Sequence, residues 1–226
     1  MMPGRLLAQT TVSTLAQGWL LYRGARTADW PVGWVFLGLF AACSLGVGLY
    51  LLRHDPALLR ERMTLPVHGN QARRDKLLLV AVGLLWCLWL FGMGRDAMQH
   101  RFAAMPVAVQ ALGALLFIGG FGMAGWTFAA NSFASPAVRM QPERGHHVID
   151  TGPYAFVRHP MYAGALLLCL GMPLLLGSPI GLLGLPIGAA LLALRTRWEE
   201  EALRAGLPGY APYAARVRYR FVPGLW

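Results

Sequence analysis

Charged residues are scarce in this chain. They make up 13% of its 226 residues, with 10 acidic residues against 20 Lys and Arg, and the single lysine is Lys76. Hydrophobic residues reach 56%. Because too few polar side chains remain to cover a water-soluble globule of this size, the composition excludes an ordinary soluble domain and indicates a membrane protein.

Cysteine is also rare. The three cysteines, Cys43, Cys87 and Cys169, each lie inside an apolar run. This placement supports neither a disulfide framework nor a metal cluster, so we expect packing roles for them and no metal site. The net charge of +10 is spread over segments that flank the apolar runs, which favours contact with membrane lipids over binding of nucleic acid.

Six apolar runs are candidates for membrane-spanning helices, since a helix needs about 20 apolar residues to cross the hydrocarbon layer. Only Gly177-Ser178-Pro179 separates the last two runs, which therefore form a helical hairpin. No repeat or linker divides the chain. The sequence thus predicts one domain over residues 1–226, an all-α polytopic membrane helix bundle with a C-terminal hairpin and an interfacial tail. The runs cover residues 5–22, 32–52, 77–93, 106–130, 161–176 and 180–194.

The first run is the least apolar, because Gln, Thr and Ser residues between positions 9 and 17 dilute it. A secretory signal peptide is the alternative, but no small-x-small cleavage pattern followed by a soluble region is evident. Polar side chains in a membrane helix can face neighbouring helices. We therefore expect this run to be a membrane span.

Arginine is distributed unevenly over the loops. Cytoplasmic loops are enriched in Lys and Arg, and with six spans one side of the membrane would carry only Arg23, Arg26, Arg95 and Arg101. All other basic residues fall on the opposite side, together with both termini and the two ends of the hairpin. The arginine-rich, lysine-poor composition also suggests a GC-rich bacterial genome. We expect an integral protein of the bacterial cytoplasmic membrane whose functional region faces the cytoplasm.

The connection between residues 131 and 159 is long, polar and rich in aromatic side chains. Connections of this length in a compact protein are usually functional or disordered, and the ordering aromatic residues favour function. Pro160 suits the first turn of the following helix and holds His159 at its N-terminus. Tyr154, His159 and Tyr162 would then gather at one membrane depth.

Arg195 and Glu199 stand four residues apart after the last apolar run, so they share one face of a continuing helix. The tight hairpin brings this helix end close to the start of the preceding helix. The sequence therefore predicts one pocket lined by His159, Tyr162, Arg195 and Glu199. The neighbouring charges are interpreted as a solvated surface run, namely Glu200, Glu201 and Arg204.

Several sequence elements follow in a fixed order over residues 141–225. They are Arg-His-Pro-x-Tyr-x-Gly at 158–164, the hairpin, Glu-Glu-x-x-Leu at 199–203, and Gly-Tyr-x-x-Tyr at 209–213 with Pro-Gly at 223–224. Each element alone is weak, but their order and spacing are specific. Together they resemble the isoprenylcysteine carboxyl methyltransferase family and its relatives among the phospholipid methyltransferases.

This resemblance implies a membrane-embedded helical enzyme that uses S-adenosyl-L-methionine. Residues 1–130 would supply N-terminal transmembrane helices and residues 131–226 the cofactor-binding catalytic region. A soluble Rossmann-type Gly-x-Gly-x-x-Gly loop is not expected, and none is convincing here. By motif position, Arg195 would face the methyl acceptor and, with Glu199, carry catalysis. The cofactor would contact Gln141, His146, His147, Val148, Ile149, Tyr154, His159, Pro160, Met161, Tyr162 and Glu199.

The methyl acceptor is left open between two chemistries. A carboxylate is nucleophilic at neutral pH and needs only orientation, for which the planar fork of Arg195 is suited. An amine must first lose a proton, and Glu199 or His159 would then be the base. The position of Arg195 favours the carboxylate. In both cases we expect a lipophilic small molecule or a lipid that enters from the bilayer.

Two other classes of protein compete with this interpretation. NADPH-dependent sterol-type reductases carry a similar element, His-Pro-Asn-Tyr-x-Gly-Glu, but this chain has Met161 and Ala165 in place of the Asn and the acid. A non-enzymatic membrane scaffold would leave one predicted feature unexplained, the cluster of Tyr154, His159, Arg195 and Glu199. The methyltransferase is therefore favoured.

Overall fold

The computed structural model describes residues 2–64, 73–99, 105–135 and 144–226, and within these ranges it is helical with no strand. This confirms the all-α fold. Within these ranges, six long helices lie in the first part of the chain and in the hairpin, with shorter elements between them. The elements are α1 (Met2–Ala25), α2 (Pro31–His54), α3 (Pro56–Arg62), α4 (Arg73–Gln99), α5 (Val107–Ala130), η3 (Gly152–Ala155), α6 (Pro160–Leu176), η4 (Ile180–Leu183), α7 (Gly184–Gly206) and α8 (Tyr210–Arg216).

Among the described residues, four helical segments are long and apolar enough to cross a membrane: Pro31–His54, Arg73–Gln99, Val107–Ala130 and Ile180–Gly206. A further apolar helix, Pro160–Leu176, is shorter. Helix α1 has the length of a span but not the hydropathy, so its crossing of the membrane stays a prediction. The structure thus confirms an integral, polytopic helix bundle.

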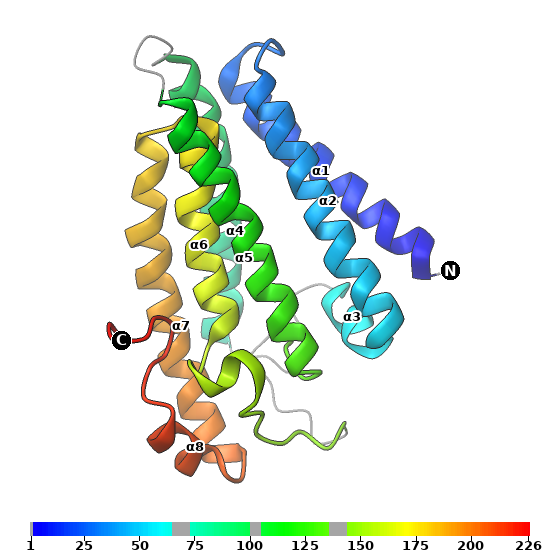
Figure 1. The fold of residues 1–226 in the computed structure, drawn as a ribbon, viewed down its shortest axis with the longest axis vertical. Helices are drawn as coiled ribbons and strands as arrows, with labels where there is room; N and C mark the ends of the chain where they lie inside the picture. Colours follow the sequence, from blue (N-terminus) through cyan, green and yellow to red (C-terminus); the bar gives the residue numbers. More distant parts are fainter. Residues whose placement is uncertain (1, 65–72, 100–104, 136–143) are drawn as a thin grey trace.

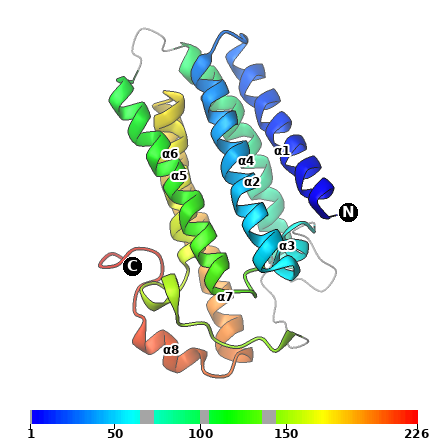
Figure 2. The same ribbon diagram turned by 45° about the vertical axis from the view of Figure 1, so that its right-hand side comes forward.

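The long helices form two groups, α1 with α2 and α4, and α5 with α6 and α7; Figure 1 shows α1 and α2 inclined to α5 and α6, and Figure 2 shows the same arrangement from another side. Helices α5 and α6 are the most intimately packed pair, with α7 beside α6, and α1 lies against α4 and α2. One apolar cluster ties the two groups together through Leu21, Phe36, Met93, Phe117 and Met172. The ends of α5 and α7, the start of α6 and helix α8 meet at one end of the molecule.

Prolines and caps fix the ends of these helices. The side chain of Asp55 accepts a hydrogen bond from the backbone N–H of Leu58, and Pro56 follows at the first position of α3, so α2 stops and α3 starts at this residue. At the hairpin turn, Gly177 has φ +71°, which a residue without Cβ adopts readily, and Pro179 then prevents continuation of α6. The hairpin predicted from Gly177-Ser178-Pro179 is therefore present.

Glycines let the backbones of α5 and α6 approach closely. A Cβ atom on Gly171 would lie 2.7 Å from the backbone nitrogen of Phe117, and one on Gly164 would lie 2.9 Å from the carbonyl oxygen of Gly120. The glycines Gly119, Gly122 and Gly125 also recur at helical spacing on α5, but a Cβ on Gly119 or Gly122 would meet nothing within 4 Å. Spacing alone does not reveal which side of an entirely apolar helix meets its neighbour.

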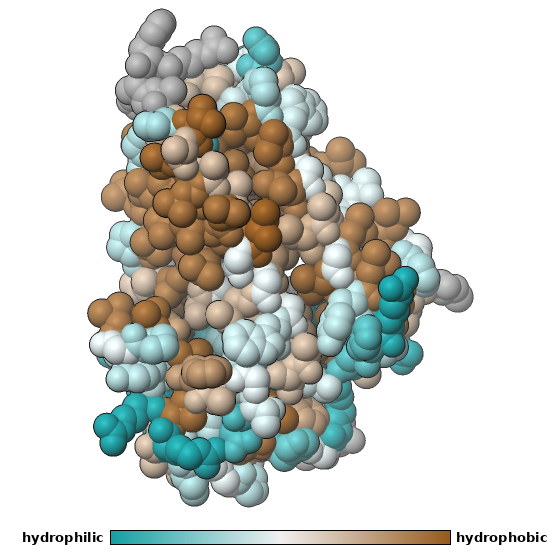
Figure 3. Space-filling model, viewed as in Figure 1, coloured by the Kyte–Doolittle hydropathy of each residue, from teal (hydrophilic) through white to brown (hydrophobic). Residues whose placement is uncertain are grey.

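The surface divides into an apolar region and a polar end (Figure 3). Large apolar side chains on the long helices are exposed, among them Leu84, Leu88 and Leu115, each at more than 60% of the fully exposed area. A soluble protein rarely exposes a continuous apolar area of this kind, whereas lipid would cover it. Most basic residues of the described part lie at the end that carries α3 and α8, as the loop charges predict.

We expect the substitution Gly171→Ala to lower the thermal stability of the purified protein in detergent. Its Cβ would force α5 and α6 apart, and overpacking of this kind costs roughly 1–3 kcal/mol. Gly119→Ala is the matched control, because it adds the same methyl group to open space on the partner helix. Equal melting temperatures for the two variants would contradict the proposed contact.

Candidate functional site

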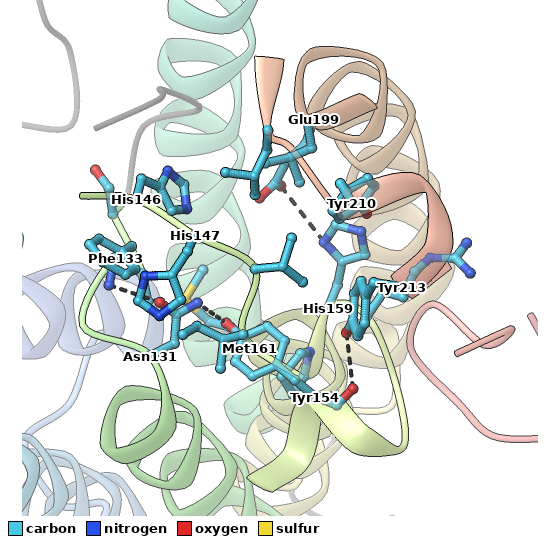
Figure 4. A pocket seen from close by; sticks show the side chains of 18 of the residues that line it. Asn131, Phe133, His146, His147, Tyr154, His159, Met161, Glu199, Tyr210 and Tyr213 are labelled. Carbon is cyan, nitrogen blue, oxygen red and sulfur yellow. Dashed lines mark hydrogen bonds and ion pairs between the residues drawn. The ribbon is translucent and has the colours of Figure 1, made fainter. Parts of the chain in front are cut away.

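A cavity of about 360 Å³ lies at the polar end of the bundle, where α6 begins and α7 ends. Its walls come from the segment after α5, from residues 146–149, from η3 and from α8, in addition to the two hairpin helices. Figure 4 shows Phe133, His146 and His147 on one side and Glu199, His159 and Tyr210 on the other. Segments far apart in sequence therefore enclose one space.

The two ends of the hairpin meet at this cavity. The hydroxyl of Tyr162 donates a hydrogen bond of 2.6 Å to Glu199 Oε2, a length typical of a hydroxyl bound to a carboxylate. His159 Nδ1 lies 3.8 Å from the same oxygen, and its ring stacks on Tyr162 with a centroid separation of 5.4 Å. The predicted proximity of His159, Tyr162 and Glu199 is confirmed.

Glu200 is the centre of a buried charge network behind the cavity. Only 4% of it is exposed, and its Oε1 accepts a hydrogen bond of 2.7 Å from Arg158 Nε. Arg220 Nη2 donates to Oε2 at 3.1 Å, and His159 Nε2 lies 3.3 Å from Oε1. The interpretation of Glu200 as a solvated surface charge is therefore wrong.

Further hydrogen bonds extend this network into the C-terminal tail. Arg158 Nη1 donates to the carbonyl oxygens of Val217 and Arg218 at 2.7 and 2.9 Å. The backbone N–H groups of Arg158 and His159 donate to the carbonyls of Tyr219 and Arg220, both at 2.9 Å. The tail thus lies along the entry to α6 and fixes the backbone that presents His159.

Tyr154 forms the floor of the cavity (Figure 4). Its hydroxyl accepts a hydrogen bond of 2.8 Å from Asn131 Nδ2, and its carbonyl accepts one of 2.9 Å from the hydroxyl of Tyr213. Burial raises the pKa of the hydroxyl groups of Tyr154 and Tyr213 above the usual value for tyrosine. Both groups therefore remain protonated throughout the neutral pH range.

Tyr210 differs from these two tyrosines. It is 4% exposed and lines the cavity, yet its buried hydroxyl has no hydrogen-bond partner within the described ranges. Burial raises the pKa of this hydroxyl as well. A buried donor without a partner is destabilising. A ligand in the cavity that accepts a hydrogen bond from the Tyr210 hydroxyl would remove this cost.

Helix α3 supports the wall opposite α8. Arg62 Nη1 donates to the carbonyl of Ala134 at 2.9 Å and contacts Met161 Sδ at 3.7 Å, and its guanidinium lies over the ring of Phe128. Burial lowers the pKa of Arg62 to about 10, which still leaves it charged at neutral pH. The N-terminal half of the chain therefore holds part of the cavity in place.

The cavity contains most of the predicted cofactor residues. Gln141 lies outside the described residues, so its expected contact is not placed. Arg195 does not line the cavity, and the prediction of one pocket shared by Arg195 and His159 is wrong in that respect. The predicted residues on the cavity wall are His146, His147, Val148, Ile149, Tyr154, His159, Pro160, Met161, Tyr162 and Glu199.

Arg195 instead marks the end of an adjacent apolar groove of about 460 Å³. The groove runs between α4 and α7 over α6, from Trp89 and Gly184 to Leu78 and Arg195. Arg195 Nε lies 3.3 Å from Asp75 Oδ1 on α4, and both side chains are largely buried. Since Arg195 stands one helical turn before Glu199, the groove ends beside the cavity.

Sequence reasoning missed four residues of this region that the structure brings in. Asp75 and Asn131 had no motif around them, and the tail residue Arg220 resembled its arginine neighbours. Only Tyr210 stood in a recognised element, Gly-Tyr-x-x-Tyr, which could have indicated a role at the site.

Residues 108–207 match the model of the phospholipid methyltransferase family. The matched region contains α5, the connection that carries Tyr154, and the hairpin with His159 and Glu199. This match confirms the resemblance predicted from the sequence motifs and supports a membrane enzyme that is a methyltransferase. No significant match is found among curated proteins.

We expect Glu200→Gln to destabilise the protein by roughly 3–5 kcal/mol, because it leaves two guanidinium groups next to a neutral amide in a buried place. Thermal unfolding in detergent would measure the effect. Glu201→Gln is the control: its side chain is 66% exposed, so its loss of charge should change stability by no more than about 0.5 kcal/mol. A similar melting temperature for both variants would show that the Glu200 network does not stabilise the fold.

Proposed function

We propose that this protein is an S-adenosylmethionine-dependent methyltransferase that methylates the headgroup of a lipid at the membrane surface. One observation carries the proposal. Glu199 lies in the wall of a polar cavity, held there by Tyr162 and His159, and one helical turn away Arg195 ends an apolar groove. A polar compartment and an apolar compartment therefore adjoin at one helix face.

The cavity suits the proposed cofactor, which combines a sulfonium cation with an amino acid and an adenosine. Its aromatic walls at Phe133 and Tyr154 offer stacking surfaces, and Glu199 offers a negative charge for the cation. The hydroxyl of Tyr210 offers a donor that has no partner among the described residues. When bound, the cofactor supplies an electrophilic methyl group. The residues of the cavity would hold it, orient it and exclude water.

The groove suits the hydrocarbon chain of an acceptor. It extends along α4 between Leu78 and Gly92, about 20 Å at 1.5 Å per residue, and apolar side chains form nearly all of its surface. A hydrocarbon chain that moves from the bilayer into this groove stays in apolar surroundings, so none of its methylene groups is exposed to water. A lipid could enter sideways from the bilayer with its headgroup beside Arg195 and Glu199.

The charges near the groove favour an amine acceptor over the carboxylate that Arg195 alone suggests. Asp75 already compensates the charge of Arg195, and Glu199 adds a second carboxylate within electrostatic range. A carboxylate acceptor would be repelled by Glu199, whereas an amine would be attracted. A phospholipid amine also offers a phosphate, for which a guanidinium is a good partner. Glu199, assisted by His159, would take the proton that the amine must lose before attack.

The positions of the basic residues support an orientation with this site towards the cytoplasm. The exposed apolar side chains of the long helices support residence in a membrane. We propose that this is the bacterial cytoplasmic membrane. In this orientation the cofactor would enter the cavity from the cytoplasm.

Calorimetric titration of the purified protein tests the cofactor. S-adenosylmethionine should bind and NADPH should not, and Glu199→Ala should abolish or greatly weaken that binding because it removes the carboxylate of the cavity. Arg195→Ala should leave cofactor binding intact, since Arg195 lies in the groove. Binding of NADPH alone would favour the reductase, and binding of neither would overturn the proposed function.

Methyl transfer from labelled cofactor then tests the acceptor. Vesicles that contain phosphatidylethanolamine should become labelled in the lipid amine, with loss of activity in Arg195→Ala. A prenylated cysteine with a free carboxylate, added in the same vesicles, is the second probe. Labelling of that probe and not of the lipid would refute the amine assignment and restore the carboxylate.

We expect Tyr210→Phe to weaken the binding of S-adenosylmethionine by about threefold to tenfold, the equivalent of one hydrogen bond, without loss of thermal stability. Tyr213→Phe is the matched control on the same helix, because its hydroxyl already binds the carbonyl of Tyr154. That variant should lose stability. If Tyr210→Phe binds the cofactor as wild type does, its hydroxyl is not a ligand.

A further inference from the structure

Asp75 is a buried acid that none of the sequence motifs contains. It stands in the first turn of α4, is 4% exposed and pairs with Arg195 of α7 across the end of the groove, with 3.3 Å between Arg195 Nε and Asp75 Oδ1. A buried ion pair contributes little net stability, because desolvation of two charges offsets their attraction. Its placement therefore calls for another explanation.

The same two helices carry a second pair that serves as a reference. Arg74 Nη2 and Glu201 Oε2 lie 3.6 Å apart, with 55% and 66% of their side chains exposed. Pairs of this kind contribute about 0–1 kcal/mol and are screened by salt. If a link between α4 and α7 were all that the fold needed, the exposed pair would supply it without burying Asp75.

Helix geometry gives Arg195 an alternative partner. Residues four apart on a helix face one another, so Arg195 and Glu199 would ordinarily form an ion pair. The structure instead pairs Arg195 with Asp75, and Glu199 with Tyr162 and His159. Asp75 thus competes with Glu199 for the same guanidinium.

We propose that Asp75 is a positioning residue that holds Arg195 at the end of the groove and keeps it from neutralising Glu199. This inference rests on the proposed function, in which Glu199 binds the cofactor and accepts the proton of the amine, and Arg195 faces the acceptor. Asp75 lines neither the cavity nor the groove. It acts by keeping the positive group and the negative group of α7 separate, so that each faces its own compartment.

Cofactor affinity is the first readout. In Asp75→Asn, Arg195 should turn to Glu199 and weaken the binding of S-adenosylmethionine about tenfold, a loss within the range of a charged hydrogen bond. The double variant Asp75→Asn with Arg195→Gln should bind within about threefold of wild type, because the competing cation is gone. Glu201→Gln, which removes one acid from the exposed pair on the same helices, should have no effect. Calorimetry below the melting temperature of every variant separates this result from a loss of folded protein.

A purely structural Asp75 would give a different pattern. Asp75→Asn would then lower the melting temperature and leave cofactor affinity unchanged in the folded protein, which overturns the proposal. A failure of the second substitution to restore binding overturns it as well.

A second readout does not depend on any cofactor. A double-mutant cycle of Arg195→Gln and Glu199→Gln, followed by thermal unfolding, measures the coupling between these two residues. We expect a stronger coupling in the Asp75→Asn background than in wild type. Equal coupling in both backgrounds would refute the role of Asp75. If the wild-type protein does not bind S-adenosylmethionine but the coupling is still stronger in the Asp75→Asn background, only the proposed function is refuted.

Discussion

The burial of Glu200 among Arg158, His159 and Arg220 is the interaction on which the site depends. It joins three distant stretches of chain, the entry to α6, the end of α7 and the C-terminal tail, through charge-assisted hydrogen bonds in a place that water reaches poorly. A charge taken out of water is costly unless it is fully paired. The network therefore permits few alternative arrangements, and the positions of His159 and Glu199 follow from it.

Helix packing places this network at the right end of the bundle. The close contact of α5 with α6 through glycine backbones fixes α6, and the short turn at Gly177 then brings α7 back alongside. Helix α3 adds a support from the N-terminal half through Arg62. The cavity is thus built by the whole described bundle and not by the hairpin alone.

Much of this could be predicted from the sequence, for reasons that are local. Apolar runs of membrane length, a proline at the first position of α6 and a three-residue turn define helices and a hairpin without knowledge of tertiary contacts. The meeting of His159, Tyr162 and Glu199 follows from that hairpin. The position of Arg195 does not, because a spacing of four residues fixes the face of a helix but not the neighbour that competes for the side chain, here Asp75 from α4. Glu200 was misread for a related reason. A run of three acids contains no sign of which one turns inward, and only the arginines of distant segments decide it.

The apolar groove between α4 and α7 opens to the side of the bundle, along helices whose surfaces suit lipid. For a molecule that arrives by this route, the concentration that matters is its mole fraction among the surrounding lipids. The volume of water around the protein has no effect on that concentration. Added detergent enlarges the hydrocarbon phase and dilutes the acceptor within it. The rate of methyl transfer would then fall, even when the total amount of acceptor in the tube is unchanged.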